Sequence, residues 1–575
     1  MKTWLKYVKP YWKYFLAGPA GMIVEVAGEM FMPLFMAMVM DNAQDKGVWY
    51  CIGVTVLMIL TALVMMAGGI GGAYFGAEAS VNFAADLRED VYRSVQRFSF
   101  GNIDRFSTGS LVTRLTNDVT QLQNFVNMLL RMALRSPGML IGGIIMAVML
   151  KPKLSVVLAV SVPLLLISLS GIILKGFSRF SRVQTSIDSL NATVQESLTN
   201  VRVVKSLVRE DHEIQKFKTA NHTLKDANMS AMKIMIWMQP IMTVFMNLTV
   251  LAVLWFGGNM VVAGDMRFSE LSAFITYVTQ ILSSLMMVTM MLMTSSRALA
   301  SAKRIKQVLH EQPDLDDLTA SSKEQQVLQG RIEFRDVTFR YYKDSDDPVL
   351  SNINLTIEAG STVGIIGSTG CGKTTLVSMI PRFYDPDEGE ILVDGINVKD
   401  YSLYHLREGV GMVLQKNVLF SGTIEDNLRW GNQDATMDEI RAAAEHAQAD
   451  KFVTSFTKGY DTDLGQGGSN VSGGQKQRLC IARALLKKPR ILILDDSTSA
   501  VDTATEAHIR KAFASELKDT TKIIIAQRIG SVMDAHCIVV MDNGKITGVG
   551  THEELLATNT EYQEIYYSQM EKKEA

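Results

Sequence analysis

Six long apolar stretches in the N-terminal half constrain the fold of this chain more than any other feature. They run approximately over residues 14–40, 50–77, 125–150, 154–174, 235–262 and 271–293. A helix needs about 20 mainly apolar residues to cross the roughly 30 Å of hydrocarbon in a bilayer, and each stretch is long enough. The sequence therefore predicts six membrane spans, with the lipid bilayer as a partner of the chain.

The N-terminus predicts how these spans are oriented. Lys2, Lys6, Lys9 and Lys13 precede the first span and are interspersed with Trp and Tyr, as in an amphipathic helix on a membrane surface. The excess of lysine places this end in the cytoplasm by the positive-inside rule, and six crossings return the chain there. We therefore predict a multi-pass protein of the inner or plasma membrane whose C-terminal part is cytoplasmic.

The loops that face the cytoplasm in this topology are long and helix-favouring. Residues 80–124 and 177–228 are rich in charged residues and contain few turn residues. In the first loop Leu87, Val91 and Val95 recur every four residues, which is the spacing of one helix face. We expect the membrane helices to continue well into the cytoplasm; the alternative is a pair of simple solvated loops.

A change of pattern divides the chain. Residues 1–310 contain the six spans and form the predicted membrane domain. Residues 311–330 are polar, lack sustained periodicity and are predicted to be a linker. From residue 331 to residue 575, short β-rich runs alternate with helical segments, which indicates an α/β domain.

Composition argues against two other classes of protein. The net charge of −2 shows no basic excess of the kind that nucleic-acid binding requires, so no nucleic-acid partner is expected. The four cysteines are scattered without the spacing of metal ligands or of a disulfide framework.

A glycine-rich loop follows the predicted strand TVGII. The segment GSTGCGKTT fits G-x-x-x-x-G-K-[ST] between a strand and a helix, where backbone N–H groups surround the phosphates of a nucleotide. In this pattern Lys373 contacts the β- and γ-phosphates, and Thr374 is a ligand of Mg²⁺. The predicted binding residues for ATP are Gly367, Ser368, Thr369, Gly370, Cys371, Gly372, Lys373, Thr374 and Thr375. The predicted fold is therefore an α-helical membrane domain fused to an α/β P-loop nucleotide-binding domain.

Two further segments add to the predicted phosphate chemistry. The apolar strand ILIL leads to Asp495, which we expect to ligate Mg²⁺, and to Asp496 directly after it. The segment NVSGGQKQR places Ser472, Gly473 and Gly474 at the start of a helical segment, where they form a second anion-binding loop. One γ-phosphate has no use for two such loops from one chain, so the second loop is expected to face a nucleotide held by another chain.

In their order and spacing, these motifs resemble those of the ATP-binding cassette (ABC) family. Six spans followed by one cassette resemble half of an ABC exporter, and the resemblance covers essentially the whole chain. VSGGQ, residues 471–475, resembles the family's signature motif. Residues 105–119 look like the first intracellular loop of its exporters.

The resemblance also implies roles for single residues. Tyr341 matches the aromatic residue that stacks on adenine, and Gln415 matches the Q-loop glutamine, a catalytic and Mg²⁺-ligand position. Gln475 closes the signature motif. Asp502 ends SAVD, which resembles the D-loop, and is implied to contact nucleotide.

Two positions depart from the family pattern. The family has glutamate after the Mg²⁺-binding aspartate and a histidine near the γ-phosphate, and here these places hold Asp496 and Gln527. Aspartate is one methylene shorter, and a displacement of about an ångström costs on the order of a hundredfold in rate. Glutamine forms hydrogen bonds but carries no charge and exchanges no proton. We expect a degenerate site that binds ATP and hydrolyses it slowly; the alternative is a shifted loop in which Asp496 replaces the glutamate.

In these respects the chain is most similar to the degenerate-site subunit of bacterial heterodimeric multidrug exporters. The expected partner is a homologous six-span half-transporter, whose own glutamate and histidine perform hydrolysis beside the signature motif of this chain. A third departure lies at Gln466 and Gly467, where related exporters usually have glutamate and arginine. It changes the segment that senses the helices of the opposite chain.

The first span carries two carboxylates, Glu25 and Glu29, one helical turn apart near the middle of the bilayer. A charge there costs roughly 2.5–3.5 kcal/mol on insertion scales, so these side chains are expected to face a cavity or a partner. One hypothesis is that they attract cationic amphiphiles into a methionine-lined chamber. The alternative is a structural contact, for example with Arg131 or Arg135. The predicted substrate residues are Glu25, Glu29, Met286 and Met290.

The function that follows is ATP-driven export of small amphipathic compounds of the multidrug type, by one half of a heterodimeric, ATP-hydrolysing translocase. A lipid flippase or a peptide exporter of the same architecture remains an alternative. A nucleotide-gated regulatory subunit or channel is a third.

Overall fold

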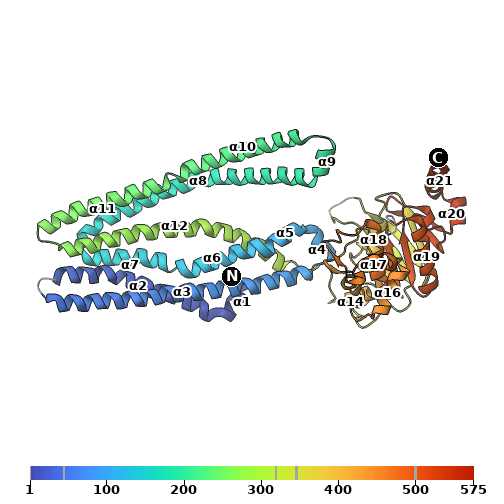
Figure 1. Ribbon diagram of the computed structural model, residues 1–575, viewed down its shortest axis with the longest axis horizontal. Helices are drawn as coiled ribbons and strands as arrows, with labels where there is room; N and C mark the ends of the chain where they lie inside the picture. Colours follow the sequence, from blue (N-terminus) through green and yellow to red (C-terminus); the bar gives the residue numbers. More distant parts are fainter. Residues whose placement is uncertain (1, 43–45, 318–319, 344–346, 498–500, 575) are drawn as a thin grey trace. The chain divides into compact units, whose positions relative to one another are not determined.

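A computed structural model of the chain describes residues 2–42, 46–317, 320–343, 347–497 and 501–574 (Figure 1). The chain forms two compact units. The helical unit combines residues 1–95 with 109–310, and the C-terminal unit combines residues 96–108 with 311–575. Residues 96–108 lie inside the predicted membrane domain but pack with the C-terminal unit.

The helical unit is built from long helices. Its elements are α1 (Lys2–Val8), η1 (Lys9–Tyr11), α2 (Trp12–Asn42), α3 (Gly47–Gln96), α5 (Thr108–Thr113), the π-helical turn η2 (Arg114–Asp118), α6 (Val119–Met132), α7 (Arg135–Leu150), α8 (Pro152–Thr199), α9 (Val201–Ser206), α10 (Glu210–Met235), α11 (Met238–Val262) and α12 (Phe268–His310). Among the described residues, six helical segments are long and apolar enough to cross a membrane: Thr3–Asn42, Gly47–Gln96, Thr108–Leu150, Pro152–Thr199, Glu210–Val262 and Phe268–Thr289. They coincide with the six predicted spans.

The predicted helix extensions are confirmed. Helix α3 contains 50 residues and α8 contains 48. At 1.5 Å per residue each is more than about 70 Å long, over twice the thickness of the hydrocarbon core. Helices α8 and α10 lie side by side and are joined by the short helix α9 (Figure 1). The alternative of simple solvated loops is therefore wrong.

Glycine brings α2 and α3 into close contact. A Cβ atom on Gly21 would lie 2.6 Å from the carbonyl oxygen of Gly68, and a Cβ on Gly68 would lie 2.8 Å from the carbonyl oxygen of Gly21. Larger residues at either position would push the helices apart. Small residues serve this purpose in membrane helices, where packing replaces the hydrophobic effect as the force of association.

Helix α12 lies at the centre of the helical core. Its side chains Phe274, Tyr277 and Ile281 are fully buried, and the helix packs against α2, α6, α7 and α11. The Tyr277 hydroxyl donates a hydrogen bond of 2.6 Å to the carbonyl oxygen of Met30 on α2. A buried hydroxyl needs such a partner, so this contact fixes α12 against the first span.

The C-terminal unit contains a mainly parallel sheet of order β12-β11-β3-β10-β9-β6, an antiparallel sheet of order β2-β1-β4-β5, and the pair β7-β8. The strands are β1 (Ile332–Phe339), β2 (Leu350–Ile357), β3 (Thr362–Gly367), β4 (Glu388–Val393), β5 (Ile396–Asn397), β6 (Val410–Val413), β7 (Gly422–Thr423), β8 (Asp463–Leu464), β9 (Ile491–Asp495), β10 (Thr521–Ile525), β11 (Cys537–Asp542) and β12 (Lys545–Gly550). Strands β3, β9 and β10 run parallel side by side. Their carboxyl ends therefore meet at one edge of the sheet, where parallel sheets place ligand sites.

The helices of this unit pack around the strands and on one another. They are α13 (Lys373–Ser378), α14 (Leu403–Glu408), α15 (Ile424–Arg429), α16 (Met437–His446), α17 (Asp450–Ser455), α18 (Gly473–Leu486), α19 (Thr503–Glu516), α20 (His552–Thr558) and α21 (Thr560–Glu574). Strand β9 is buried along its whole length, which explains its continuous run of Ile and Leu.

The short helix α4 (Phe100–Arg105) belongs to the C-terminal unit. The ring of Phe100 stacks on that of Phe383 at a centroid distance of 4.2 Å. The Tyr384 hydroxyl donates to the Asp104 carboxylate over 2.8 Å. The predicted linker also packs with this unit, since Ser322 forms a β-bridge with Tyr401.

Candidate nucleotide-binding site

The glycine-rich loop connects β3 to α13, as its motif predicted. Gly372 has a φ angle of +97°, and a Cβ there would lie 2.8 Å from Leu350 Cδ2, so only glycine suits this position. The ammonium of Lys373 donates to the carbonyl oxygens of Gly367 and Ser368, over 2.8 and 2.7 Å. The lysine therefore lies over the loop, with its charge held next to the expected position of the phosphates.

Asp495 and Thr374 form the Mg²⁺ side of the site. Asp495 ends β9 with only 1% of its surface exposed, and its Oδ1 accepts a hydrogen bond of 3.0 Å from the Thr374 hydroxyl. Its Oδ2 is buried without a hydrogen-bond partner among the described residues. Burial, with a smaller contribution from the charge of Asp496, raises the pKa of Asp495. An orphaned carboxylate oxygen beside a hydroxyl fits a bound cation, so these two residues fit Mg²⁺.

The three residues predicted to act in hydrolysis come together at the same edge of the sheet. Gln527, two residues after β10, donates from Nε2 to Asp496 Oδ2 over 2.7 Å. Gln415, two residues after β6, approaches the same oxygen from its Nε2 at 3.5 Å, the limit of a hydrogen bond. Asp496 adopts a left-handed backbone with φ of +47°, which is uncommon for a residue other than glycine. Oδ2 of Asp496 thus lies next to the side-chain amides of both Gln527 and Gln415.

Tyr341 lies between the loop and a cluster of aromatic rings. Its hydroxyl is 2.9 Å from the Thr375 hydroxyl, and its ring meets those of Phe339 and Tyr384 edge to face, at 5.0 and 5.2 Å. The residue is nevertheless 43% exposed. A ring that is held at its edge and open on the surface is suited to stack on a base.

The aromatic cluster also contains residues that motif reasoning missed. Burial and the hydrogen bond to Asp104 raise the pKa of Tyr384, so its hydroxyl stays protonated and keeps this contact. Phe100 and Asp104 of α4 are separated from Tyr384 by about half of the chain. No local pattern in the sequence could have indicated this pairing.

The signature segment begins α18, as predicted. The Ser472 hydroxyl accepts from the backbone N–H of Gln475, and the Gln475 carboxamide accepts from the N–H of Ser472, over 3.3 and 2.9 Å. This capping box fixes the start of the helix. Ser472 and Gly473 are exposed, while Gly474 and Gln475 are half-buried. The segment is therefore ordered by its own residues and open on its outer side.

Hydrogen bonds also fix two segments near the signature segment. Lys476 donates to the carbonyl oxygen of Gly467 over 2.8 Å, which ties the loop containing Gln466 and Gly467 to α18. In the SAVD segment, Asp502 accepts from the N–H of Thr505 over 2.9 Å and caps α19. Ser499 lies outside the described residues.

Helix α21 supplies a second contact that the sequence did not indicate. The Gln569 side chain donates to the carbonyl oxygen of Gln527 and accepts from the N–H of Ile529, both over 2.9 Å. One amide thus holds the backbone on both sides of Arg528. It positions the segment from which Gln527 reaches Asp496.

In the helical unit, both carboxylates of the first span share one cation. Arg135 lies 3.0 Å from Glu25 and 2.9 Å from Glu29. Of the two arginines that the sequence offered as structural partners, Arg135 makes this contact. Met286 is half-buried and packs against the helical core, and the side chain of Met290 lies outside the described residues.

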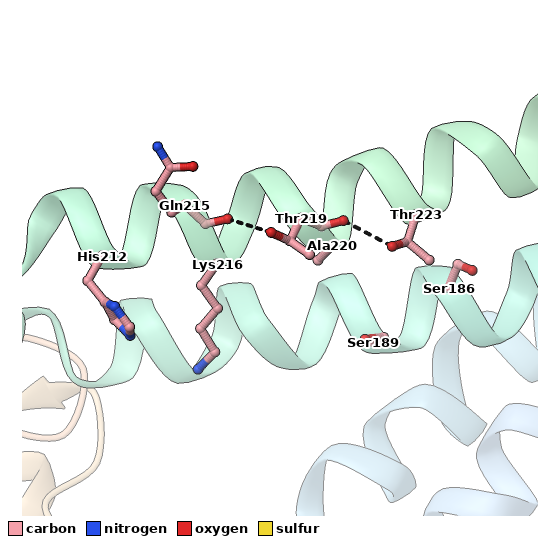
Figure 2. Close-up of a pocket in the computed structure, with 8 residues that line it drawn as sticks. All are labelled: Ser186, Ser189, His212, Gln215, Lys216, Thr219, Ala220 and Thr223. Atoms are coloured by element: carbon pink, nitrogen blue, oxygen red, sulfur yellow. Dashed lines mark hydrogen bonds between the residues drawn. The ribbon is translucent and has the colours of Figure 1, made fainter.

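A polar groove between α8 and α10 is separate from the residues above. Figure 2 shows its lining, with His212 and Lys216 of α10 pointing towards α8. The hydroxyls of Thr219 and Thr223 donate to carbonyl oxygens of their own helix, and Lys216 pairs with Glu196. Thr219, Thr223 and Lys216 therefore find their partners within the two helices.

Among the described residues, a helical unit with six segments long and apolar enough to cross a membrane, joined to a unit with a P-loop, is typical of ATP-driven membrane transporters. Two family models match the sequence: the ABC transporter transmembrane region over residues 15–285, and the ABC transporter model over residues 350–499. The chain belongs to the ABC transporter family.

Curated relatives match over nearly the whole chain. The uncharacterized ABC transporter ATP-binding protein YfiB of Bacillus subtilis is 40% identical over 99% of this chain and 98% of its own length. The protein Rv1273c of Mycobacterium tuberculosis, also an uncharacterized ABC transporter ATP-binding protein, is 38% identical over 98% of this chain and 97% of its own. The ATP-dependent lipid A-core flippase of Syntrophus aciditrophicus is 34% identical over 84% of this chain and 80% of its own.

A solved structure shows the same architecture. A bacterial Atm1-family ABC exporter with ATP bound superposes with a TM-score of 0.79 at 25% identity, covering 98% of each chain. The predicted fold class is therefore confirmed. The protein is a multi-pass membrane protein with the ABC exporter fold, and its nucleotide-binding domain lies on the cytoplasmic side.

Proposed function

We propose that this chain is one half of a heterodimeric exporter of small amphipathic compounds of the multidrug type. Its own nucleotide site binds ATP with Mg²⁺ but hydrolyses it slowly. The observation that carries the proposal is the 2.7 Å hydrogen bond from Gln527 to Asp496, in a site whose nucleotide-binding residues are intact.

Binding needs only groups that are present. The backbone of the glycine-rich loop, with the Lys373 ammonium, suits a triphosphate. Thr374 and Asp495 would hold Mg²⁺, which neutralises phosphate charge when it is bound. Mg²⁺ held there would give the buried Asp495 Oδ2 the partner that it lacks among the described residues.

Hydrolysis needs a carboxylate that reaches the attacking water. Asp496 has the shorter side chain, and one of its oxygens accepts the Gln527 amide. A water placed about an ångström too far from its base reacts on the order of a hundred times more slowly. Gln527 adds neither a positive charge nor a proton. Retained binding with slow hydrolysis follows from these two side chains.

The signature segment then acts on a second site. Its exposed Ser472 and Gly473 suit the completion of a nucleotide site on a homologous partner, where a glutamate and a histidine of that partner perform hydrolysis. Two bound nucleotides favour the closed pair of cassettes, and hydrolysis at the competent site restores the open pair. This is a population shift driven by differential nucleotide binding.

A lipid flippase is a second candidate, because two relatives that are 34% identical are named ATP-dependent lipid A-core flippases. The two candidates share the asymmetric nucleotide chemistry and differ in the transported molecule.

The test compares the chain alone with the chain assembled with a homologous half-exporter. We expect the isolated chain to bind Mg-ATP and to turn it over at least about tenfold more slowly than the pair, because its own site lacks the competent base. The variant Lys373→Ala controls for contaminating ATPase activity. Turnover by the isolated chain equal to that of the pair would contradict the proposal.

A further inference from the structure

A cavity of about 450 Å³ lies beside the carboxylates of the first span, within the helical unit. Its wall combines Met22 and Glu25 of α2, Met65 and Met66 of α3, Arg131 of α6 and Arg135 of α7. This volume is within the range of small-molecule sites, and it is large enough for a polar headgroup with part of a hydrocarbon chain.

The charged groups at the cavity include one ion-paired cluster. Arg135 is shared by Glu25, which lines the cavity, and Glu29, so one cation faces two anions in this cluster. Glu25 Oε2 is buried and has no hydrogen-bond partner among the described residues. The cluster of Glu25, Glu29 and Arg135 therefore carries excess negative charge and an acceptor without a hydrogen-bond partner among the described residues.

Arg131 provides the opposite charge. It lines the same cavity, yet among the described residues no carboxylate lies within 4.0 Å of its guanidinium. With Glu25, Glu29 and Arg135, it makes the formal charge of the cluster zero. The hypothesis of a cation-attracting chamber counted the charges of Glu25 and Glu29 alone. The two arginines cancel those charges.

The apolar part of the wall is adaptable. A Cβ on Gly72 would lie 2.2 Å from Met22 Cε, and a Cβ on Gly28 would lie 2.2 Å from Met65 Cγ. Each methionine thus occupies space that a glycine on the facing helix leaves open. Methionine is flexible and polarizable, so such a wall adjusts to chains of different shape.

We propose that this cavity binds the polar end of a zwitterionic amphiphile. An ammonium group lies against the free oxygen of Glu25, an acidic group such as a phosphate lies against Arg131, and the hydrocarbon follows Met22, Met65 and Met66. The inference names a substrate class for the proposed export function and rests on that function.

Charge decides between a zwitterion and a simple cation. Two like charges about 6 Å apart at an effective dielectric constant of about 20 disfavour binding by roughly a hundredfold. Arg131 repels a purely cationic ligand, and Glu25 repels a purely anionic one. A zwitterion satisfies both residues, because each of its charges faces the opposite charge of the protein.

The experiment uses the assembled pair in lipid vesicles and four fluorescent probes with one fluorophore and one alkyl chain. The probes carry a neutral, cationic, anionic or zwitterionic headgroup, and ATP-driven transport is measured for each. We expect the zwitterion to be transported best. Arg131→Gln should lower its rate about tenfold relative to the neutral probe, as the loss of one charge-assisted hydrogen bond predicts. Arg131→Lys should restore most of this rate.

Binding measured without turnover separates a lost site from a misfolded protein. In detergent, displacement of the zwitterionic probe from the pair is compared for Glu25→Gln, Arg131→Gln and the exposed control Arg182→Gln, each with its unfolding temperature. We expect Glu25→Gln to weaken the cationic and zwitterionic probes, Arg131→Gln to weaken the anionic and zwitterionic probes, and Arg182→Gln to change none of them.

The possible outcomes distinguish the inference from the function on which it rests. Transport of all four probes at rates that neither Glu25→Gln nor Arg131→Gln alters selectively would overturn the inference and leave amphiphile export standing. Failure to transport any probe would overturn the proposed function and the inference with it. A vesicle containing phosphatidylethanolamine labelled on its acyl chain, which keeps the headgroup ammonium free, shows whether the zwitterion is a membrane lipid. Transport of the soluble probe alone identifies a soluble compound, and either source supports the proposed chemistry.

Discussion

Two pairs of carboxylates, one in each unit, are held in opposite ways. In the C-terminal unit Asp495 and Asp496 are adjacent in sequence. Asp495 accepts a hydrogen bond from the Thr374 hydroxyl and keeps one oxygen without a hydrogen-bond partner among the described residues, and Asp496 lies beside the side-chain amides of Gln527 and Gln415. In the helical unit Glu25 and Glu29 share the single guanidinium of Arg135.

The difference shows where each pair obtains its compensating charge. Carboxylates within a membrane span need a cation from the protein itself, here from a neighbouring helix. An uncompensated charge at that depth is costly whether or not a ligand is bound. The cytoplasmic pair lies in the nucleotide site, where bound Mg²⁺ would supply the compensating charge. Removal of the Arg135 guanidinium should therefore damage the fold, whereas removal of the Lys373 ammonium from the nucleotide site should lower the affinity for ligand.

The largest effect is expected from Arg135→Leu. It leaves two carboxylates without their cation in a low-dielectric region, and breaking such a pair costs about 3–5 kcal/mol. Unfolding in detergent, followed by circular dichroism, should show this loss. Arg131→Leu is the matched control with no ion pair to break, and Glu25→Gln with Glu29→Gln should rescue Arg135→Leu. Equal unfolding temperatures for the two arginine variants would mean that Arg135 does not compensate the pair.

Lys373→Ala should affect ligand affinity and leave the fold intact. The loss of one charged contact to phosphate costs about 1.5–3 kcal/mol, or roughly ten- to a hundredfold in the dissociation constant for Mg-ATP. Titration calorimetry measures this directly. The exposed Lys451→Ala serves as the control, and equal affinities for the two variants would remove Lys373 from the site.

Asp496→Glu combined with Gln527→His should raise hydrolysis at this site of the pair by about tenfold, since the first change restores reach and the second restores a charged, proton-exchanging group. ATPase assays of the pair measure it. Asp496→Asn is the informative control: it should change turnover of the pair less than about twofold, because the native carboxylate contributes little. A large loss with Asp496→Asn would show that Asp496 is an active base.

The smallest effect is expected from Gln569→Leu. It removes two hydrogen bonds to the segment that carries Gln527, worth about 1 kcal/mol each. Release of a fluorescent ATP analogue from this site should accelerate several-fold. Gln563→Leu on the same helix removes one side-chain bond, to the carbonyl oxygen of Leu556, and among the described residues no hydrogen bond joins the Gln563 side chain to that segment. Identical release rates for the two variants would assign Gln569 a purely structural role.

The features that could be predicted are those encoded in contiguous residues. The spans follow from runs of apolar residues, and the loop at Lys373 follows from spacing within nine positions, because chain neighbours alone determine these structures. The sequence also identified Asp496 and Gln527 as departures from the family pattern, but not their direct hydrogen bond.

The contacts that could not be predicted join distant segments. Gln569 reaches the backbone of Gln527, and α4 reaches Tyr384, through side chains whose types are ordinary on a protein surface. The sequence offered Arg135 only as one of two arginine partners for the glutamates. The choice between them depends on how α2 packs against α6 and α7, which periodicity does not specify.

Nucleotide trapping in the assembled pair tests the central claim most directly. A photoreactive ATP analogue is bound with Mg²⁺, allowed to turn over once and cross-linked, and the nucleotide attached to each chain is then identified by chromatography. We expect mainly uncleaved triphosphate on this chain and mainly diphosphate on its partner. Equal diphosphate on both chains would contradict the account of Asp496 and Gln527.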